Sequence, residues 1–265
     1  MNTTVTFDSN TWRKVVTPGY SQDSTTATFA ALNKLAKEGR FAGYLPETIF
    51  NLETIPTDKR AEYFGTYRPN ITSTVVSETE GATHVRVCIG PNTTNHPGNS
   101  HYHEKHLQDA LALGFRLLSC PRIGLTRSPD INRSMFRVEN PTELQHRLDK
   151  FMAVGRDIES MNAGFAQIAE LGKKYRKGAE TWFDALLRVP KTEQHLVKKC
   201  VAEWADGDAV AAHIAYECAF LCTNDIGKAA GAGSVFSPAI RSILSSRYGV
   251  RFVTPAELLN EMVVA

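Results

Sequence analysis

The sequence predicts an α/β fold built on a mainly parallel sheet. At both ends of the 265-residue chain, short apolar runs typical of buried strands alternate with segments of helical periodicity. Acidic residues follow several of these predicted strands. In an open parallel sheet, residues at the carboxyl ends of the strands meet at one edge, which is where ligands bind. The length allows one large domain or two small ones, each with a substantial core.

The first quarter of the chain is predicted to be β-α-β-α. Residues 5–7 form a short apolar strand, and the helical spacing of Phe29, Leu32 and Leu35 predicts the helix that follows. Gly39 is a typical residue to end that helix. The second strand is predicted at 41–45, and a further helix begins within the segment 48–55, where Ile49, Leu52 and Ile55 share helical spacing.

The middle of the chain is predicted to hold further strands and a series of amphipathic helices. The predicted strands are 71–76, 83–89 and 115–118, and the predicted helices are 103–113, 141–171, 179–187 and 192–204. The α/β pattern then returns, with a helix at 208–218, a strand at 219–223, a helix at 238–248 and a strand at 250–253. Residues 254–257, Thr-Pro-Ala-Glu, form a capping box that opens a last helix.

Composition excludes some classes of protein. A hydrophobic content of 42% and a charged content of 22% are ordinary for a globular protein, and a net charge of +2 neither requires nor excludes a polyanionic partner. No run approaches the roughly 20 apolar residues of a membrane span, and the first residues lack a secretory signal. The five cysteines include no Cys-x-x-Cys pair. We therefore expect reduced thiols, a cytoplasmic location and no membrane association.

Acidic residues at strand ends carry the chemistry. Asp8 ends the apolar run at the N-terminus, and Glu47 or Glu53 follows the second strand. Asp208 is predicted to open an alanine-rich helix, and Asp225 closes the strand after it. Carboxylates gathered at one edge repel one another unless a cation lies between them, and oxygen ligands favour Mg²⁺ or Mn²⁺. This pattern predicts a metal-dependent enzyme that acts on phosphate.

Each acid also has a purely structural interpretation. Asp8 can be a turn residue followed by the turn formers Ser9 and Asn10, and Asp225 can belong to a turn of its own. Asp206 and Asp208 can be an N-cap and a first-turn acid of the predicted helix. The combination of these acids, in this order and at strand ends, favours the functional interpretation.

Several of these segments resemble the PIN domain, a family of metal-dependent ribonucleases. Residues 208–216, the turn Cys222-Thr223-Asn224-Asp225 and residues 248–258 resemble its C-terminal half. The N-terminal Phe7-Asp8-Ser9-Asn10 is similar to the family's opening Asp-x-Asn. The resemblance covers approximately residues 1–60 and 200–265. It implies a PIN-like three-layer fold with a twisted, mainly parallel sheet, and an acidic cluster that binds Mg²⁺ or Mn²⁺.

The resemblance also implies roles for single residues. Asp8 matches the first acid of the family, Asp208 the acid at a helix start, and Asp225 the acid of Thr-Asn-Asp. Glu53 fits the position of the family's glutamate best, with Glu47 as the alternative. Asn10 and Thr223 would orient the acids or the bound water. The predicted metal ligands are then drawn from Asp8, Glu47, Glu53, Asp206, Asp208 and Asp225.

The expected domain organisation is a PIN-like core of residues 1–82 and 200–265, interrupted by a mainly helical insertion at 83–199. The expected function is a metal-dependent endonuclease that hydrolyses phosphodiester bonds, with RNA as its substrate. One alternative is a catalytically inactive PIN-like scaffold that binds RNA or protein. A Mg²⁺-dependent phosphatase is disfavoured, because it needs Asp-x-Asp where this chain has Asp8-Ser9-Asn10. An antitoxin or other protein partner and a homo-oligomer stay open.

Two further groups of residues are candidates for binding. His96, His101, His103 and His106 are close in sequence and offer a rival zinc site, although a solvated loop is the expected alternative. Between residues 173 and 199, eight Lys or Arg minus three Asp or Glu leave a local charge of +5, with Tyr175 and Trp182 interleaved. This segment is either a nucleic-acid-binding face or a solvated helical surface.

Overall fold

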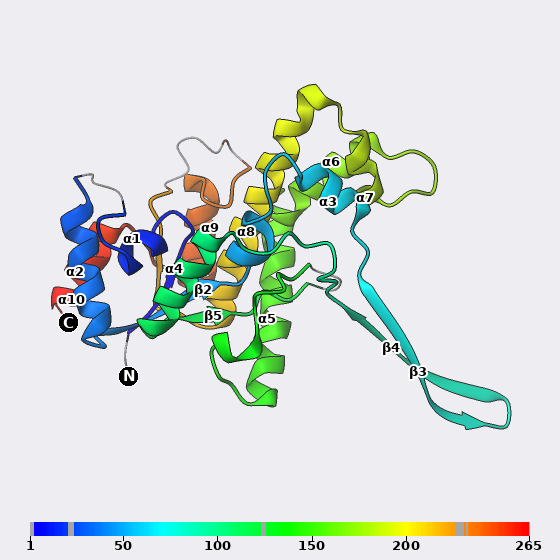
Figure 1. Ribbon diagram of the computed structural model, residues 1–265, viewed down its shortest axis with the longest axis horizontal. Coiled ribbons are helices and arrows are strands. Elements are labelled where there is room, and N and C mark those ends of the chain that lie inside the picture. The colour runs from blue at the N-terminus through cyan, green and yellow to red at the C-terminus, as the bar shows by residue number, and fades with distance from the viewer. Residues whose placement is uncertain (1–2, 21–23, 123–125, 226–230, 232, 265) are drawn as a thin grey trace.

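The computed structural model describes residues 3–20, 24–122, 126–225, 231 and 233–264 (Figure 1). It confirms an α/β fold, because the described residues form a five-stranded sheet in the order β5-β2-β1-β6-β7. All neighbouring strands in it are parallel. The strands are β1 (Thr3–Phe7), β2 (Phe41–Pro46), β5 (Arg116–Leu118), β6 (Phe220–Cys222) and β7 (Phe252–Val253). The sheet therefore takes β5 from the segment that was expected to be an insertion.

One face of the sheet is covered by four helices that come from both ends and the middle of the chain. They are α1 (Trp12–Val16), α2 (Thr26–Lys37), α4 (His101–Ala112) and α10 (Pro255–Val264). Side chains alternate along a strand, so Val5 and Phe7 both point into this core. The predicted capping box of α10 is confirmed, since Thr254 N donates to Glu257 and Glu257 N donates to Thr254 Oγ1.

The other face is covered by α5 (Pro141–Ser160), the second half of α8 (Gln194–Ala215) and α9 (Pro238–Tyr248). Alanines at 211, 212 and 215 let α8 pack closely on this face. His213 is buried there and hydrogen-bonded through Nδ1 to Thr6 Oγ1 at 3.0 Å. Burial lowers the pKa of His213 to about 3, so it is a neutral core histidine. The sheet and its two helical faces make three layers.

A helical lobe extends beyond the sheet and has a core of its own. It combines α3 (Arg60–Thr66), α6 (Phe165–Tyr175), α7 (Trp182–Ala185) and the first half of α8. Short helical turns complete the described structure: the π-helix η1 (Ile49–Glu53) and the 3₁₀ turns η2 (Arg133–Met135), η3 (Leu186–Arg188) and η4 (Lys191–Glu193). The helix predicted at 141–171 is in fact two helices, which separate where Asn162 and Gly164 have positive φ angles of 57° and 61°.

Helix α8 is one unbroken helix of 22 residues. The prediction of two helices, with Asp208 at the start of the second, is therefore wrong. The sequence Asp206-Gly207-Asp208 has the composition of a helix cap, but Gly207 has a packing role instead. A Cβ atom on Gly207 would lie 2.7 Å from the Cα atom of Gly164, at the start of α6. Glycine at this position allows α6 and α8 to approach closely.

The remaining two strands form a separate antiparallel sheet. β3 (Asn70–Thr79) and β4 (Ala82–Gly90) pair with each other as a long hairpin that projects from the body of the protein (Figure 1). The domain boundary expected between residues 82 and 83 falls inside this hairpin, at the start of β4. Among the described residues, no helix combines the length and apolar character needed to span a membrane.

Candidate functional site

Asp8 is the centre of a hydrogen-bond network at the carboxyl ends of β1 and β6. Its carboxylate is almost fully buried, at 6% exposure. One oxygen accepts a hydrogen bond from Ser9 N at 2.6 Å, and the other accepts from Asn10 Nδ2 and Thr223 Oγ1, both at 2.7 Å. Asn10 and Thr223 therefore contact Asp8 directly, in the arrangement expected of residues that orient an acid.

The loop after β6 is held by the same network. Asn224 N donates to Asn10 Oδ1 at 3.0 Å, and Asp225 N donates to Thr223 Oγ1 at 2.9 Å. These contacts join two segments that lie more than 200 positions apart in the sequence. Asp8 and Asp225 are brought to the same edge of the sheet, as the strand-end pattern predicts.

This edge lies at the point where the strand order reverses direction. From β1 the chain builds β2 and β5 on one side of the sheet, and it later adds β6 and β7 on the other side. In open parallel sheets, the loops at such a switch point diverge and leave a crevice outside the strand ends. Asp8 follows β1 and Asp225 follows β6, so the two acids flank this crevice.

A pocket of about 580 Å³ occupies the crevice, a size suited to a small ligand or to part of a larger one. It is lined by four acids, which are Asp8, Glu53, Asp206 and Asp225. Glu53 is the last residue of η1, and Asp206 lies on α8. The guanidinium of Arg60 fixes η1 against α8, since it donates to the carbonyl oxygens of Glu53 and Lys198 at 3.0 Å and 3.1 Å.

The acids of the pocket disfavour one another's ionisation. Burial and the nearby Asp8 carboxylate raise the pKa of Glu53 from 4.5 to about 8. Burial, followed by the charges of Asp8 and Glu53, raises the pKa of Asp206 well above its ordinary value. Burial also raises the pKa of Asp8, although the hydrogen bond from Thr223 opposes the shift. Shifts of this kind, from like charges in a cleft, are typical of functional sites.

One wall of the pocket is basic. One side of α8 contributes three basic residues to it, His195, Lys198 and Lys199, and the same side carries Ala202 and Asp206. Their spacing of three or four residues places them on one side of the helix. Arg60 contributes from α3. Lys198 and Lys199 belong to the basic segment predicted at 173–199, whose proximity to the acids was not predicted from the sequence. If the sequence had been predicted to form one continuous helix from 194 through 206, the spacing of these residues would have placed them on one side of it.

Asp208 does not line the pocket, which corrects its expected role. It is completely buried on a different side of α8, where Arg122 Nε donates to both carboxylate oxygens at 2.9 Å and 2.8 Å. Trp204 Nε1 donates to the same carboxylate at 2.9 Å. Burial raises the pKa of Asp208, with Arg122 opposing the shift. Asp208 thus joins α8 to the loop after β5 as part of the protein interior.

Glu47 also lies outside the pocket, although it follows the second strand as expected. Its side chain is 1% exposed and forms an ion pair with Arg127, with 2.7 Å between Oε1 and Nε. The other oxygen accepts a hydrogen bond from Cys120 N at 3.1 Å. Of the two alternative glutamates, Glu53 is the one that reaches the pocket.

The histidines do not form a shared site. His96 is hydrogen-bonded to Asn51 O at 3.1 Å, His103 to Ser100 Oγ at 2.8 Å, and His106 to Thr17 Oγ1 at 3.2 Å. Across the described part of the chain, no group of three or more His, Cys, Asp or Glu side chains is arranged so that it could hold a metal ion. Neither the described histidines of the 96–106 segment nor the four acids of the pocket, in their present rotamers, form such a group.

Comparison with protein families, with curated proteins and with solved structures gives no match for this chain. The role of the pocket therefore has to be inferred from its own side chains.

Proposed function

We propose that this chain is a PIN-like, metal-dependent endonuclease that hydrolyses phosphodiester bonds in RNA. One observation carries the proposal: Asp8, Glu53, Asp206 and Asp225 line a single pocket at the switch point of a parallel sheet. Four acids that lie close together repel one another and lower the stability of the fold, so their arrangement is best explained by a function. In this proposal Asp206 takes the role that the resemblance gave to Asp208.

The donor chemistry of the pocket fits Mg²⁺ or Mn²⁺. All four acids offer oxygen ligands, and the raised pKa values of Asp8, Glu53 and Asp206 are those of carboxylates that a nearby cation would return to the ionised state. Asp8, Asp206 and Asp225 would hold the ion, with Glu53 beside it, after rotation of their side chains. A bound ion would lower the pKa of a water molecule and offset charge on the phosphate oxygens.

The chain's own residues supply the other parts of the reaction. Asn10 and Thr223 hold the carboxylate of Asp8 in place by the hydrogen bonds described above. Lys198 and Lys199 would bind the phosphate backbone next to the acids, because an ammonium group attracts phosphate without reading sequence. RNA is proposed as the substrate because the resembled family acts on RNA.

A second candidate is a PIN-like scaffold that binds RNA without cleaving it. It is favoured because, among the described residues, the acids in their present positions do not form a group that could hold a metal ion. Binding would then rest on the basic wall of the pocket alone, and Glu53, with a pKa of about 8, would stay partly protonated at neutral pH.

A cleavage assay with purified protein separates the two candidates. Labelled single-stranded RNA is incubated with Mn²⁺, with Mg²⁺ or with EDTA, using wild type, Asp8→Asn and Asp206→Asn. The matched control is Asp109→Asn, which changes an exposed acid on α4 that is ion-paired with Lys105. The endonuclease proposal expects cleavage that needs the metal, disappears in both pocket variants and persists in the control.

Calorimetric titration with Mn²⁺ provides a readout that does not depend on activity. Wild type and Asp109→Asn should bind Mn²⁺, whereas Asp8→Asn and Asp206→Asn should bind it at least about tenfold more weakly. Wild type that binds RNA but neither binds Mn²⁺ nor cleaves would contradict the endonuclease and support the scaffold.

A further inference from the structure

The β3–β4 hairpin, residues 70–90, is called the arm here, and no other described element covers it along its length. Every residue of β3 is exposed, and so is every residue of β4 except Gly90. Figure 1 shows the arm projecting away from the sheet and its helices. A two-stranded hairpin by itself is only marginally stable in water, and three strands or a covering element are normally needed. The arm therefore requires an explanation outside the fold of the body.

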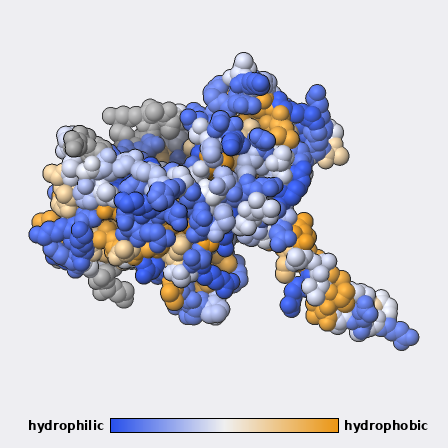
Figure 2. Space-filling view, viewed as in Figure 1, coloured by the Kyte–Doolittle hydropathy of each residue, from blue (hydrophilic) through white to orange (hydrophobic). Residues whose placement is uncertain are grey.

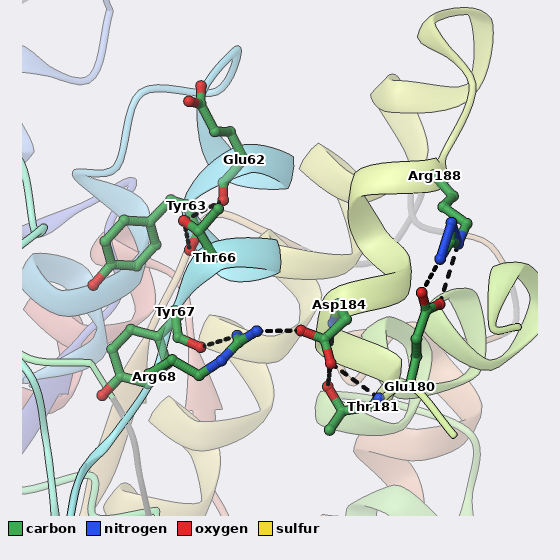
Figure 3. Close-up of polar contacts among 9 residues, drawn as sticks. All are labelled: Glu62, Tyr63, Thr66, Tyr67, Arg68, Glu180, Thr181, Asp184 and Arg188. Carbon is green, nitrogen blue, oxygen red and sulfur yellow. Dashed lines mark hydrogen bonds and ion pairs between the residues drawn. The ribbon is translucent and has the colours of Figure 1, made fainter. Parts of the chain in front are cut away.

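The root of the arm is fixed to the helical lobe. Asn92, just after β4, donates through its backbone N to the hydroxyl of Tyr67 and through Nδ2 to the carbonyl oxygen of Arg68, both at 3.0 Å. Arg68, just before β3, forms an ion pair with Asp184 of α7, with 2.5 Å between Nη2 and Oδ1 (Figure 3). Both ends of the arm are thus held, and its direction is set by the lobe.

The two faces of the arm differ sharply in polarity. Residues paired directly across an antiparallel ladder point to the same face. The register therefore gives one apolar face, which consists of Ile71, Ser73, Val75, Val85, Val87 and Ile89. The opposite face carries Thr72, Thr74, Arg86 and Cys88. The apolar side chains are between 47% exposed, for Ile89, and 60% exposed, for Ile71. Figure 2 shows hydrophobic residues gathered along the arm.

We propose that the apolar face of the arm packs against the same face of a second copy of this chain, forming a two-fold dimer. From Ile71 to Val75 and from Val85 to Ile89 the face has no charged side chain, and Glu78, paired with Thr83, lies on it only near the tip. The apolar parts of two identical faces can therefore lie on each other without bringing like charges together. Its valines and isoleucines expose roughly 400–500 Å² of surface, which is comparable with the largest apolar patch of a typical monomer, and such patches are often functional. Two such faces would together bury about 800–1,000 Å², which is close to the lower limit for a specific interface.

Charge at the two ends of the arm selects an antiparallel arrangement. The tip carries the exposed acids Glu78 and Glu80. A parallel pairing would bring the acidic tips of both copies together, and like charges in contact are unfavourable. An antiparallel pairing brings each tip toward the root of the other copy, where the side chain of Arg68 is 62% exposed. Two-fold packing of sheet faces about 10 Å apart then buries both apolar faces.

Sedimentation velocity of the full chain, from low to high micromolar concentration, tests the proposal. The test variant is Val75→Lys, on the apolar face, and the matched control is Thr74→Lys, its neighbour on the polar face. Both introduce the same charge into the same strand. Thr74 pairs with Arg86, so Thr74→Lys disturbs the hairpin itself at least as much as Val75→Lys does, and a loss of the dimer that is specific to Val75→Lys reports on the apolar face. We expect wild type and Thr74→Lys to dimerise with similar affinity. Val75→Lys should dimerise at least about a hundredfold more weakly, because it buries an unpaired charge.

Hydrogen exchange supplies a second measurement on the same samples. Backbone amides of β3 and β4 should be protected in wild type at high concentration and should lose that protection on dilution, whereas amides of β1 should not change. A wild type that stays monomeric over the whole range would overturn the proposal. A dimer that Val75→Lys and Thr74→Lys weaken equally, or that neither weakens, would also overturn it.

Discussion

Asp206 and Asp208 are only two positions apart, yet their side chains have different surroundings. Successive residues of a helix are rotated by about 100°, so residues two apart point in nearly opposite directions. Asp206 lines the pocket with the other acids, and Asp208 is buried against Arg122 and Trp204. At the scale of single residues, the same chemical group has a candidate functional role at one position and a structural role at the other.

Neutralising these two aspartates should have opposite effects on stability. Asp208→Asn removes a buried charge that pairs with Arg122, and we expect it to lower the free energy of unfolding by about 3 kcal/mol. Asp206→Asn removes repulsion within the pocket, so it should leave stability unchanged or raise it. Urea unfolding in the presence of EDTA measures both. Equal destabilisation by the two variants would show that Asp206 is structural as well.

The raised pKa of Glu53 predicts a specific dependence of stability on pH. Unfolded, this carboxyl ionises near pH 4.5, whereas in the folded protein it keeps its proton up to about pH 8. Between these values the folded state binds more protons, so the free energy of unfolding should fall as the pH rises. Asp8 and Asp206, whose pKa values are also raised, act in the same direction.

Glu53→Gln tests this prediction because glutamine does not titrate. The variant should lose less stability than wild type between pH 4.5 and about 8, and at the upper end of that range it should be the more stable protein. Thermal melts across the range, without divalent metal, give both curves, and their difference isolates Glu53 from other titrating groups. Parallel curves would mean that the pKa of Glu53 is close to its ordinary value.

At the scale of elements, α8 connects the layers of the sheet with the helical lobe. Its second half packs on the sheet, its first half packs in the lobe, and its residues that line the pocket lie along one side. The helix remains unbroken through Gly207, which costs about 1 kcal/mol of helix propensity relative to alanine. The close approach to Gly164 explains why glycine is found there.

Two helical glycines should therefore respond differently to alanine. At Gly207 the new Cβ would meet the backbone of Gly164 at 2.7 Å, and we expect a loss of about 1–3 kcal/mol from overpacking. At Gly155 of α5, the nearest atom is Nη2 of Arg122 at 3.5 Å, an ordinary contact. Gly155→Ala should then be neutral or stabilise by about 0.5–1 kcal/mol. Denaturant unfolding of both variants measures the two changes in the free energy of unfolding. If Gly207→Ala stabilised the protein, α6 and α8 would be packed less closely than the structure shows.

At the scale of the whole molecule, the body brings distant segments to one pocket and the arm extends away from it. The pocket takes residues from the N-terminal loop, η1, α3, α8 and the loop after β6. Its basic wall is therefore part of the same surface as the acids. The basic segment expected at 173–199 is partly neutralised at its start, residues 173–177, since Lys173 pairs with Glu170 and Lys174 pairs with Glu193.

If the pocket binds RNA, its own lysines should matter more than those of that segment. Replacing both Lys198 and Lys199 with alanine should weaken binding of single-stranded RNA and reduce its salt dependence by about 1.4 in slope. Replacing both Lys173 and Lys174 serves as the matched control and should have a smaller effect. Fluorescence anisotropy at several salt concentrations measures both. A larger effect of the control pair would move the binding surface to α6.

The sequence by itself determined the elements whose signals are local. These elements are the strands β1, β2 and β6, the helix α9 with its limits, and the capping box of α10. Each of them depends on residues within a few positions of one another. Asp8 and Asp225 were identified for the same reason, because each directly follows an apolar strand. The roles of Asn10 and Thr223 were expected from the resemblance, and the pairing of β1 with β6 in the structure brings both residues to Asp8.

Only the tertiary structure decided which further residues meet at the site and which surfaces stay exposed. The choice of Asp206 over Asp208 depends on the rotation of α8, which is set by contacts with Gly164 and Arg122 that are distant in sequence. The choice of Glu53 over Glu47 depends on Arg127, which pairs with Glu47 away from the pocket. From its sequence, the arm is predicted as two ordinary strands. Alternation fixes which side chains share a face, but it does not determine whether another part of the protein covers that face.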